Sequence, residues 1–163
     1  MGKKYYSVYL LVFFLFVCDR LLKYWFLKNP DIGINIINNL IKLQLGKNQG
    51  IAFGFLVNQR VLVFLLVIII FVLLLAIYHA HQNKVLPLVA GWGLIITGAI
   101  SNLIDRLKFG FVVDYIDVSF FTVFNLADAA ITFGVVIILI FNLSKKNKGS
   151  VGPLDLKEWS EII

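Results

Sequence analysis

The feature that most constrains the fold is an apolar run from about Val61 to Tyr78 that contains no charged side chain. A helix needs about 20 such residues to cross the hydrocarbon core of a bilayer. Three further windows qualify, at about 5–27, 86–104 and 126–143. Hydrophobic residues make up 60% of the 163 residues, above the roughly 45–50% that is usual in soluble domains. We therefore predict one polytopic membrane domain over residues 1–148, followed by a tail at 149–163.

The first window follows Lys3 and Lys4, a pattern that is also typical of a cleaved secretory signal. Because three more apolar segments follow, we interpret it as a retained span. Four spans place both termini on one side of the membrane. The basic residues do not say which side, because six lie on each: Lys3, Lys4, Lys84, Lys145, Lys146 and Lys148 against Lys28, Lys42, Lys47, Arg60, Arg106 and Lys108. Lys157 in the tail tips the balance only slightly.

The net charge of +6 does not indicate a nucleic-acid partner, because the basic residues stand singly or beside apolar runs, as membrane anchors do. Between the first two spans, residues 41–45 alternate apolar and polar side chains, which predicts a half-buried strand. We expect a small sheet formed by about 30–58 and 107–124, on the side of the membrane that holds most of the acids.

Six aspartates lie in or beside the apolar windows: Asp19, Asp31, Asp105, Asp114, Asp117 and Asp128. A charge at the centre of a membrane helix costs about 2.5–3.5 kcal/mol on insertion scales, so such acids are candidates for a functional site. Asp19 and Lys23 share a helix face at i,i+4, as a simple ion pair or as a brace for a site. Asn102 lies one turn inside the third window and needs polar partners.

Asn125 and Asp128 have the spacing of a helix capping box, which is the simpler interpretation of Asp128. A catalytic role is compatible with capping, because a helix N-terminus favours a carboxylate. Two carboxylates in a partly dry site share a proton, as in aspartic hydrolases.

Cys18 lies in an apolar run without a nearby histidine in sequence. His79 and His81 point to opposite sides of a helix across the membrane from the acids, so we expect no metal site.

Five motifs stand in series along residues 5–143: Asp19-x-x-x-Lys23, Asn48-x-Gly50-x-Ala52-Phe53-Gly54, Asn102-x-x-Asp105-Arg106, Val112-Val113-Asp114-Tyr115-Ile116 and Phe124-Asn125-x-Ala127-Asp128. Together they resemble the motifs of lipoprotein signal peptidase (signal peptidase II), a bacterial family of membrane aspartyl proteases. Arg20, Leu22 and Ser101 depart from that pattern, in which a glutamine, a threonine-type residue and a glycine are commoner.

The resemblance implies an all-α polytopic protein with four transmembrane helices and a small extracytoplasmic β-cradle, in the bacterial cytoplasmic membrane with both termini in the cytoplasm. It implies Asp114 and Asp128 as the catalytic pair. The residues that would shape or bind around them are Asp19, Lys23, Asn48, Gly50, Asn102, Arg106 and Asn125. We expect Asp19 and Asp105 to brace the site through Lys23 and Arg106, respectively.

The implied activity is removal of the signal peptide from prolipoproteins that carry diacylglycerol, by cleavage just before the lipidated cysteine. We expect no metal or organic cofactor, and a monomer whose other partner is membrane lipid. A small ion- or proton-coupled transporter is the alternative, with the acids as a proton relay. Acids near mid-membrane in several spans would favour it, but these acids gather at one face. An inactive relative that keeps the scaffold is a third possibility, which the intact acids disfavour.

Overall fold

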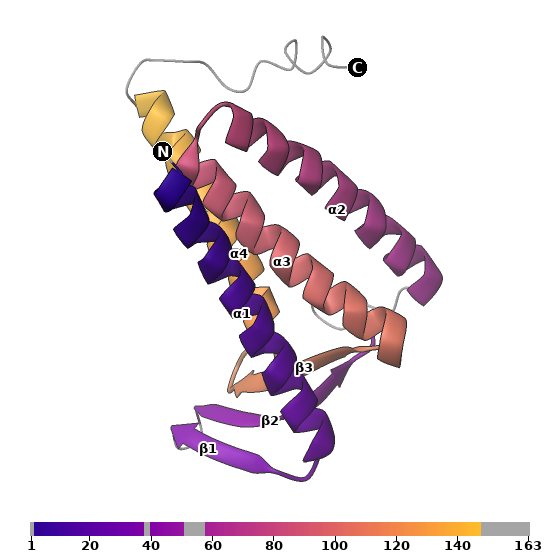
Figure 1. Ribbon diagram of the computed structural model, residues 1–163. Coiled ribbons are helices and arrows are strands. Elements are labelled where there is room, and N and C mark those ends of the chain that lie inside the picture. Colours follow the sequence, from indigo (N-terminus) through magenta and orange to yellow (C-terminus); the bar gives the residue numbers. More distant parts are fainter. Residues whose placement is uncertain (1, 38–39, 51–57, 148–163) are drawn as a thin grey trace.

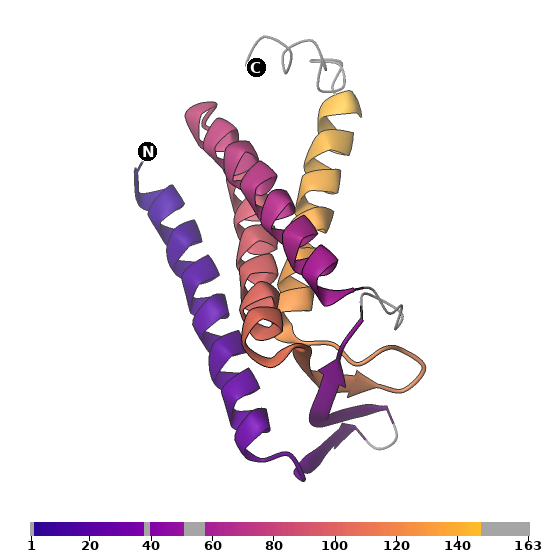
Figure 2. The ribbon, with the colours of Figure 1, turned by 90° about the vertical axis from the view of Figure 1, so that its right-hand side faces the viewer.

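The computed structural model describes residues 2–37, 40–50 and 58–147 and is mostly helical. Its helices are α1 (Gly2–Lys28), α2 (Gln59–Gln82), α3 (Leu86–Phe109) and α4 (Leu126–Asn147), and its strands are β1 (Gly33–Ile37), β2 (Ile41–Asn48) and β3 (Val112–Val118). The helices run alongside one another, and the sheet lies at one end of them, away from the start of α1 (Figure 1). Figure 2 shows α3 between α1 and α4.

Three of the helices are long and apolar enough to cross a membrane: Gln59–Gln82, Leu86–Phe109 and the Leu126–Lys145 part of α4. The windows predicted at 61–78, 86–104 and 126–143 each lie within one of these helices. The helices are longer than the windows because their polar ends keep the helical backbone pattern, whereas a hydropathy window registers only the apolar part. The window at 5–27 lies within α1, in which Asp19 and Lys23 are buried.

Small residues let α3 and α4 approach closely. A side chain added at Gly98 would collide with the backbone oxygen of Ala127, and one added at Gly134 would lie 2.6 Å from the oxygen of Gly91. Such contacts between small residues are typical of helices that pack in lipid. The close crossing brings the polar end of α3 against the first turn of α4.

The small sheet expected from the alternating pattern is confirmed, and its strand order is β1-β2-β3 with antiparallel pairing. In the register of β2 and β3, Gly46 lies opposite Asp114 and Asn48 opposite Val112. Helix α3 ends at Gly110, whose φ of 83° is a left-handed conformation that glycine adopts without strain. Strand β3 begins soon after this turn, at Val112, and contacts α3. Asp114 therefore lies near the polar end of that helix.

Candidate active site

Asp114 and Asp128 come from different elements and are joined by one residue. Asp114 is buried on β3, and Asp128 lies in the first turn of α4. The side chain of Asn125 donates a 2.7 Å hydrogen bond to Oδ1 of Asp114. Oδ1 of Asn125 accepts from the backbone N–H of Asp128 at 2.8 Å, and the Asn125 N–H donates to Oδ2 of Asp128 at 3.3 Å. The capping box is therefore present, and its first residue also holds the second acid.

Each of the two carboxylates receives a further amide donor. Asn48 donates to Oδ2 of Asp114 at 3.1 Å, and Asn102 donates to Oδ1 of Asp128 at 2.8 Å. Burial, and then the nearby charge of Asp128, raise the pKa of Asp114 from 3.8 to about 7, although the hydrogen bonds from Asn48 and Asn125 oppose the rise. A carboxyl group with this pKa is able to hold or release a proton at neutral pH, as general acid–base chemistry requires.

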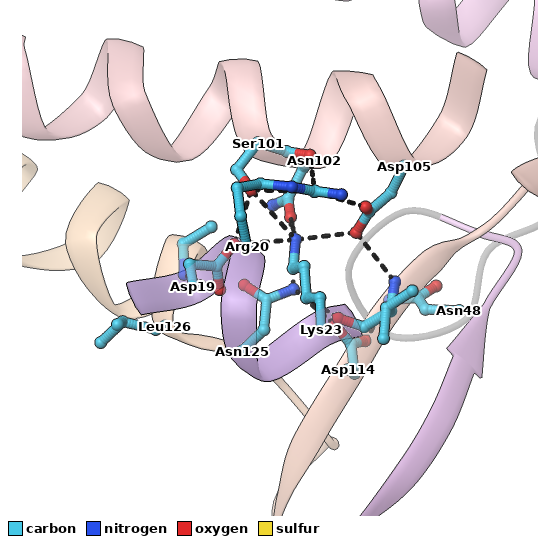
Figure 3. Close-up of polar contacts among 12 residues, drawn as sticks. Asp19, Arg20, Lys23, Asn48, Ser101, Asn102, Asp105, Asp114, Asn125 and Leu126 are labelled. Atoms are coloured by element: carbon cyan, nitrogen blue, oxygen red, sulfur yellow. Dashed lines mark hydrogen bonds and ion pairs between the residues drawn. The ribbon is translucent and has the colours of Figure 1, made fainter. Parts of the chain in front are cut away.

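A buried ion cluster lies behind this pair (Figure 3). Lys23, which has no exposed surface, places Nζ 3.2 Å from Asp19 and 2.8 Å from Asp105. The same Nζ donates to Oδ1 of Asn102 at 2.8 Å. Because its oxygen faces Lys23, the Asn102 amide turns its N–H groups toward Asp128. The predicted Asp19–Lys23 contact is thus present, and it belongs to a larger network.

Asp19 and Asp105 both reach the residues that flank the two acids. Oδ1 of Asp19 accepts from the hydroxyl of Tyr115 at 3.0 Å and from the N–H of Ala127 at 3.1 Å. Oδ2 of Asp105 accepts from the N–H of Val113 at 3.2 Å. Burial, and then the charge of Asp19, raise the pKa of Tyr115, so its hydroxyl stays neutral and remains a donor. The network thus holds the backbone immediately next to Asp114 and Asp128.

The expectation that Asp105 braces the site through Arg106 is wrong. Asp105 pairs with Arg20 at 2.6 Å and with Lys23, whereas Arg106 donates from Nη2 to the carbonyl of Gly50 at 2.7 Å. Adjacent residues on a helix point in different directions, so Asp105 faces α1 while Arg106 faces the Gly50 turn. The N–H of Gly50 in turn donates to the side chain of Asn48 at 3.1 Å.

Spacing along the chain did not single out Arg20, Ser101 or Tyr115 as members of this network. Arg20 and Ser101, two of the departures from the family pattern, are in contact with each other. A cation next to Asp19 in an apolar helix was the available signal. Asp117 accepts from Gln44 at 2.6 Å within the sheet, and Asp31 lies in a turn after α1. The predicted motif residues Ala52, Phe53 and Gly54 lie outside the described residues.

The two histidines lie in α2 and make contacts of their own. Nδ1 of His81 lies 2.9 Å from the hydroxyl of Tyr9, and His79 lies 2.8 Å from the side chain of Asn83. Among residues 2–37, 40–50 and 58–147, no three His, Cys, Asp or Glu side chains are grouped so that they could hold a metal ion.

Known proteins resemble this chain along most of its length. Residues 11–144 match the family model described as signal peptidase (SPase) II. The lipoprotein signal peptidase of Halothermothrix orenii is 32% identical over 144 residues, which cover 87% of this chain and 99% of the relative. That of Moorella thermoacetica is 39% identical over 131 residues, covering 79% of this chain and 87% of the relative.

Solved structures agree with this similarity. One structure, described as a bacterial membrane enzyme, superposes with a TM-score of 0.77 at 25% identity and covers 91% of this chain and 94% of its own. Another with the same description has a TM-score of 0.70 at 28% identity, and covers 84% and 92%.

Proposed function

Because this chain belongs to the signal peptidase II family, we propose that it removes the signal peptide from diacylglyceryl-modified prolipoproteins by cutting just before the lipidated cysteine. The relatives that support this activity are named lipoprotein signal peptidase and are 32–41% identical to the chain. The family match favours a membrane aspartic endopeptidase over the alternative of an ion- or proton-coupled transporter.

The catalytic pair in this proposal is Asp114 and Asp128. The observation that carries it is the Asn125 side chain, which donates to Asp114 from the cap of the helix that holds Asp128. Asp128 lies at the N-terminal end of α4, where the helix dipole stabilises a carboxylate. Asp114 has a pKa of about 7 and so carries a proton in a large fraction of molecules at neutral pH. The two acids therefore have different roles.

In the proposed reaction the ionised Asp128 takes a proton from a water molecule as the water oxygen attacks the scissile carbonyl carbon. Asp114, in its protonated form, donates a hydrogen bond to the carbonyl oxygen, on which negative charge develops. The C–N bond then breaks, and the proton held by Asp128 passes to the leaving amine nitrogen. Asn48, Asn102 and Asn125 orient the two carboxylates, while Asp19, Lys23, Gly50 and Arg106 support them.

The membrane arrangement is also part of the proposal. We place α1 as a fourth span beside the three apolar helices, with both termini in the cytoplasm and the sheet as the extracytoplasmic β-cradle. The paired acids lie at the sheet end of the helices, which suits a substrate whose acyl chains stay in the lipid of the cytoplasmic membrane while its peptide enters the site (Figure 1). The domain would comprise residues 1–148 and act as a monomer without a metal or organic cofactor.

The test is incubation of the purified protein with a diacylglyceryl-modified prolipoprotein, with cleavage followed by mass spectrometry. We expect the wild type to cleave and Asp114→Asn and Asp128→Asn to be inactive while keeping the helical circular dichroism spectrum. Asp117→Asn is the matched control, because Asp117 lies three residues along the same strand and is bonded to Gln44. Cleavage by Asp114→Asn or Asp128→Asn at the wild-type rate would refute the assignment of the catalytic pair. Cleavage of unmodified prolipoprotein as fast as of the lipidated form would refute the lipid requirement.

A further inference from the structure

The buried charges behind the paired acids balance only when Arg20 is counted. Asp19 and Asp105 bring two negative charges, and Lys23 lies within ion-pair distance of both. Arg20 supplies the second positive charge, 2.6 Å from Oδ1 of Asp105. The side chain of Arg20 is 23% exposed and that of Asp105 is fully buried. A buried carboxylate that loses a cationic partner is strongly destabilised, so each charge in the cluster depends on the others.

Arg20 and Lys23 divide the oxygens of Asp105 between them. Arg20 takes Oδ1, and Lys23 takes Oδ2 at 2.8 Å. Nη1 of Arg20 also donates to the carbonyl and the hydroxyl oxygen of Ser101, at 3.1 and 3.2 Å. The Ser101 hydroxyl donates in turn to Oδ2 of Asp19 at 2.5 Å. Arg20 is therefore connected to both buried acids, directly to one and through Ser101 to the other.

The cluster reaches the carboxylate of Asp128 through the side-chain amide of Asn102. An ammonium group has three N–H donors, and Nζ of Lys23 lies close to Asp19, Asp105 and Oδ1 of Asn102. Asn102 then donates to Asp128 at 2.8 Å. If Lys23 were the only cation facing both acids, it would be drawn toward them and away from Asn102. The oxygen of Asn102 would lose this 2.8 Å contact and keep the longer one from Asn125, at 3.2 Å, so its orientation would be held less firmly.

We propose that Arg20 is a positioning residue for the cleavage reaction: by holding Oδ1 of Asp105, it leaves Lys23 in place to orient Asn102 toward Asp128. This role rests on the proposed function. Arg20 touches neither of the paired acids, so its effect is indirect. It adds to the proposed site a residue that the motif spacing did not single out.

The charge balance also makes a prediction about pH. The charged and titratable groups around the pair are Asp19, Arg20 and Lys23 from α1, Asp105 and Arg106 from α3, and Tyr115 from β3. Strand β2 adds the neutral amide of Asn48. Replacing Arg20 by glutamine makes this environment one unit more negative, which favours the protonated carboxyl group of Asp114. The pH profile of cleavage should then move to higher pH.

The test compares Arg20→Gln, Arg20→Lys and the control Arg60→Gln, in nanodiscs with the lipidated prolipoprotein as substrate. Arg60 is exposed in the first turn of α2, so its replacement makes the same chemical change away from the cluster. We expect Arg20→Gln to lower kcat about tenfold with little change in KM, and to move the pH profile of kcat upward by about half a unit. Arg20→Lys, which keeps the charge, should restore the position of the profile.

If the pH profile of Arg20→Gln overlays that of the wild type, the role of Arg20 is refuted while the proposed function stands. The same holds if Arg20→Lys displaces the pH profile as far as Arg20→Gln does. A wild type that does not cleave would instead refute the proposed function. In that case thermal unfolding would still test whether Arg20 and Asp105 act as a pair, because it needs no cleavage activity. The losses in Tm caused by Arg20→Gln and Asp105→Asn should be non-additive if the two side chains act as a pair, and strict additivity would overturn the inference.

Discussion

The side-chain amide of Asn125 donates to Oδ1 of Asp114 at 2.7 Å, although Asn125 itself caps the helix that carries Asp128. One side chain thus satisfies the first turn of α4 and sets the position of an acid on β3. Asn125 therefore links the start of α4 to the acid on β3. The oxygen of the Asn125 amide caps the helix, and its nitrogen donates to Asp114. A substitution that replaces one of these atoms therefore affects one role and spares the other.

Asn125→Asp separates these two effects. The new carboxylate keeps an oxygen that can accept from the N–H of Asp128, so the cap is preserved. The donor to Asp114 is lost, and an additional negative charge lies between the two acids. We expect cleavage to fall by about 100-fold or more, measured as kcat/KM, with little change in helical content by circular dichroism.

The matched control is Asn58→Asp, because Asn58 is an exposed cap of α2 whose side-chain oxygen accepts from the N–H of Arg60. Its activity should equal that of the wild type. If Asn125→Asp retained full activity, the hydrogen bond from Asn125 to Asp114 would have no part in catalysis.

The raised pKa of Asp114 predicts how stability depends on pH. Between 3.8 and about 7 the folded protein holds a proton at Asp114 that the unfolded chain has released. The stabilisation is complete below pH 3.8 and is lost as pH rises through about 7. The Tm of the wild type relative to that of Asp114→Asn should therefore fall between pH 5 and pH 8, measured by thermal unfolding in one detergent. A constant difference would contradict the raised pKa, and Asp117→Asn provides the control.

Local patterns in the sequence predict the helices and the strand that begins at Ile41. Length and hydropathy identify the apolar helices, and period-two alternation identifies the strand, because both patterns depend on neighbouring residues. The Asp19–Lys23 contact was predictable for the same reason, since residues four apart share a helix face. The capping box at Asn125 is a local feature as well.

The partner of Asp105 was not predictable from spacing. Arg20 lies 85 positions away along the chain, and the two side chains meet only because α1 packs against α3. The adjacent Arg106 was the expected partner, yet neighbouring helix residues diverge. Spacing likewise placed several aspartates at one face without ranking them. The choice of Asp114 and Asp128 came from the family resemblance.

Tyr115 supports the site through its hydroxyl, which donates to Asp19 and accepts from the N–H of Leu126 at 3.0 Å. Tyr115→Phe removes both hydrogen bonds and leaves the stacking on Phe26, whose ring centroid lies 5.3 Å away. We expect a loss of about 1–3 kcal/mol in the free energy of unfolding, because a half-buried N–H group and a buried carboxylate oxygen each lose a partner. Tyr24→Phe, at an exposed position of α1, should have little effect. Equal stability of the two variants would show that the Tyr115 hydroxyl contributes nothing.

The crossing of α3 and α4 predicts opposite outcomes for one substitution at two glycines. At Gly98 an added methyl group would collide with the backbone oxygen of Ala127, next to Asp128. A backbone atom cannot move aside as a flexible side chain can. We expect Gly98→Ala to cost about 1–3 kcal/mol of stability and to reduce cleavage, because the start of α4 must move away from Asn102. At Gly93 the nearest atom to the added methyl group is a side-chain carbon of Val12 at 3.5 Å, an ordinary contact.

Gly93→Ala is therefore the control, since both residues are buried glycines of α3 and the chemical change is the same. There the higher helix propensity of alanine should raise stability by up to about 1 kcal/mol, with cleavage unchanged. Thermal unfolding and kcat measured side by side distinguish the two positions. If Gly98→Ala were as stable and active as Gly93→Ala, the close approach of α3 to Ala127 would not be what holds Asp128 against Asn102.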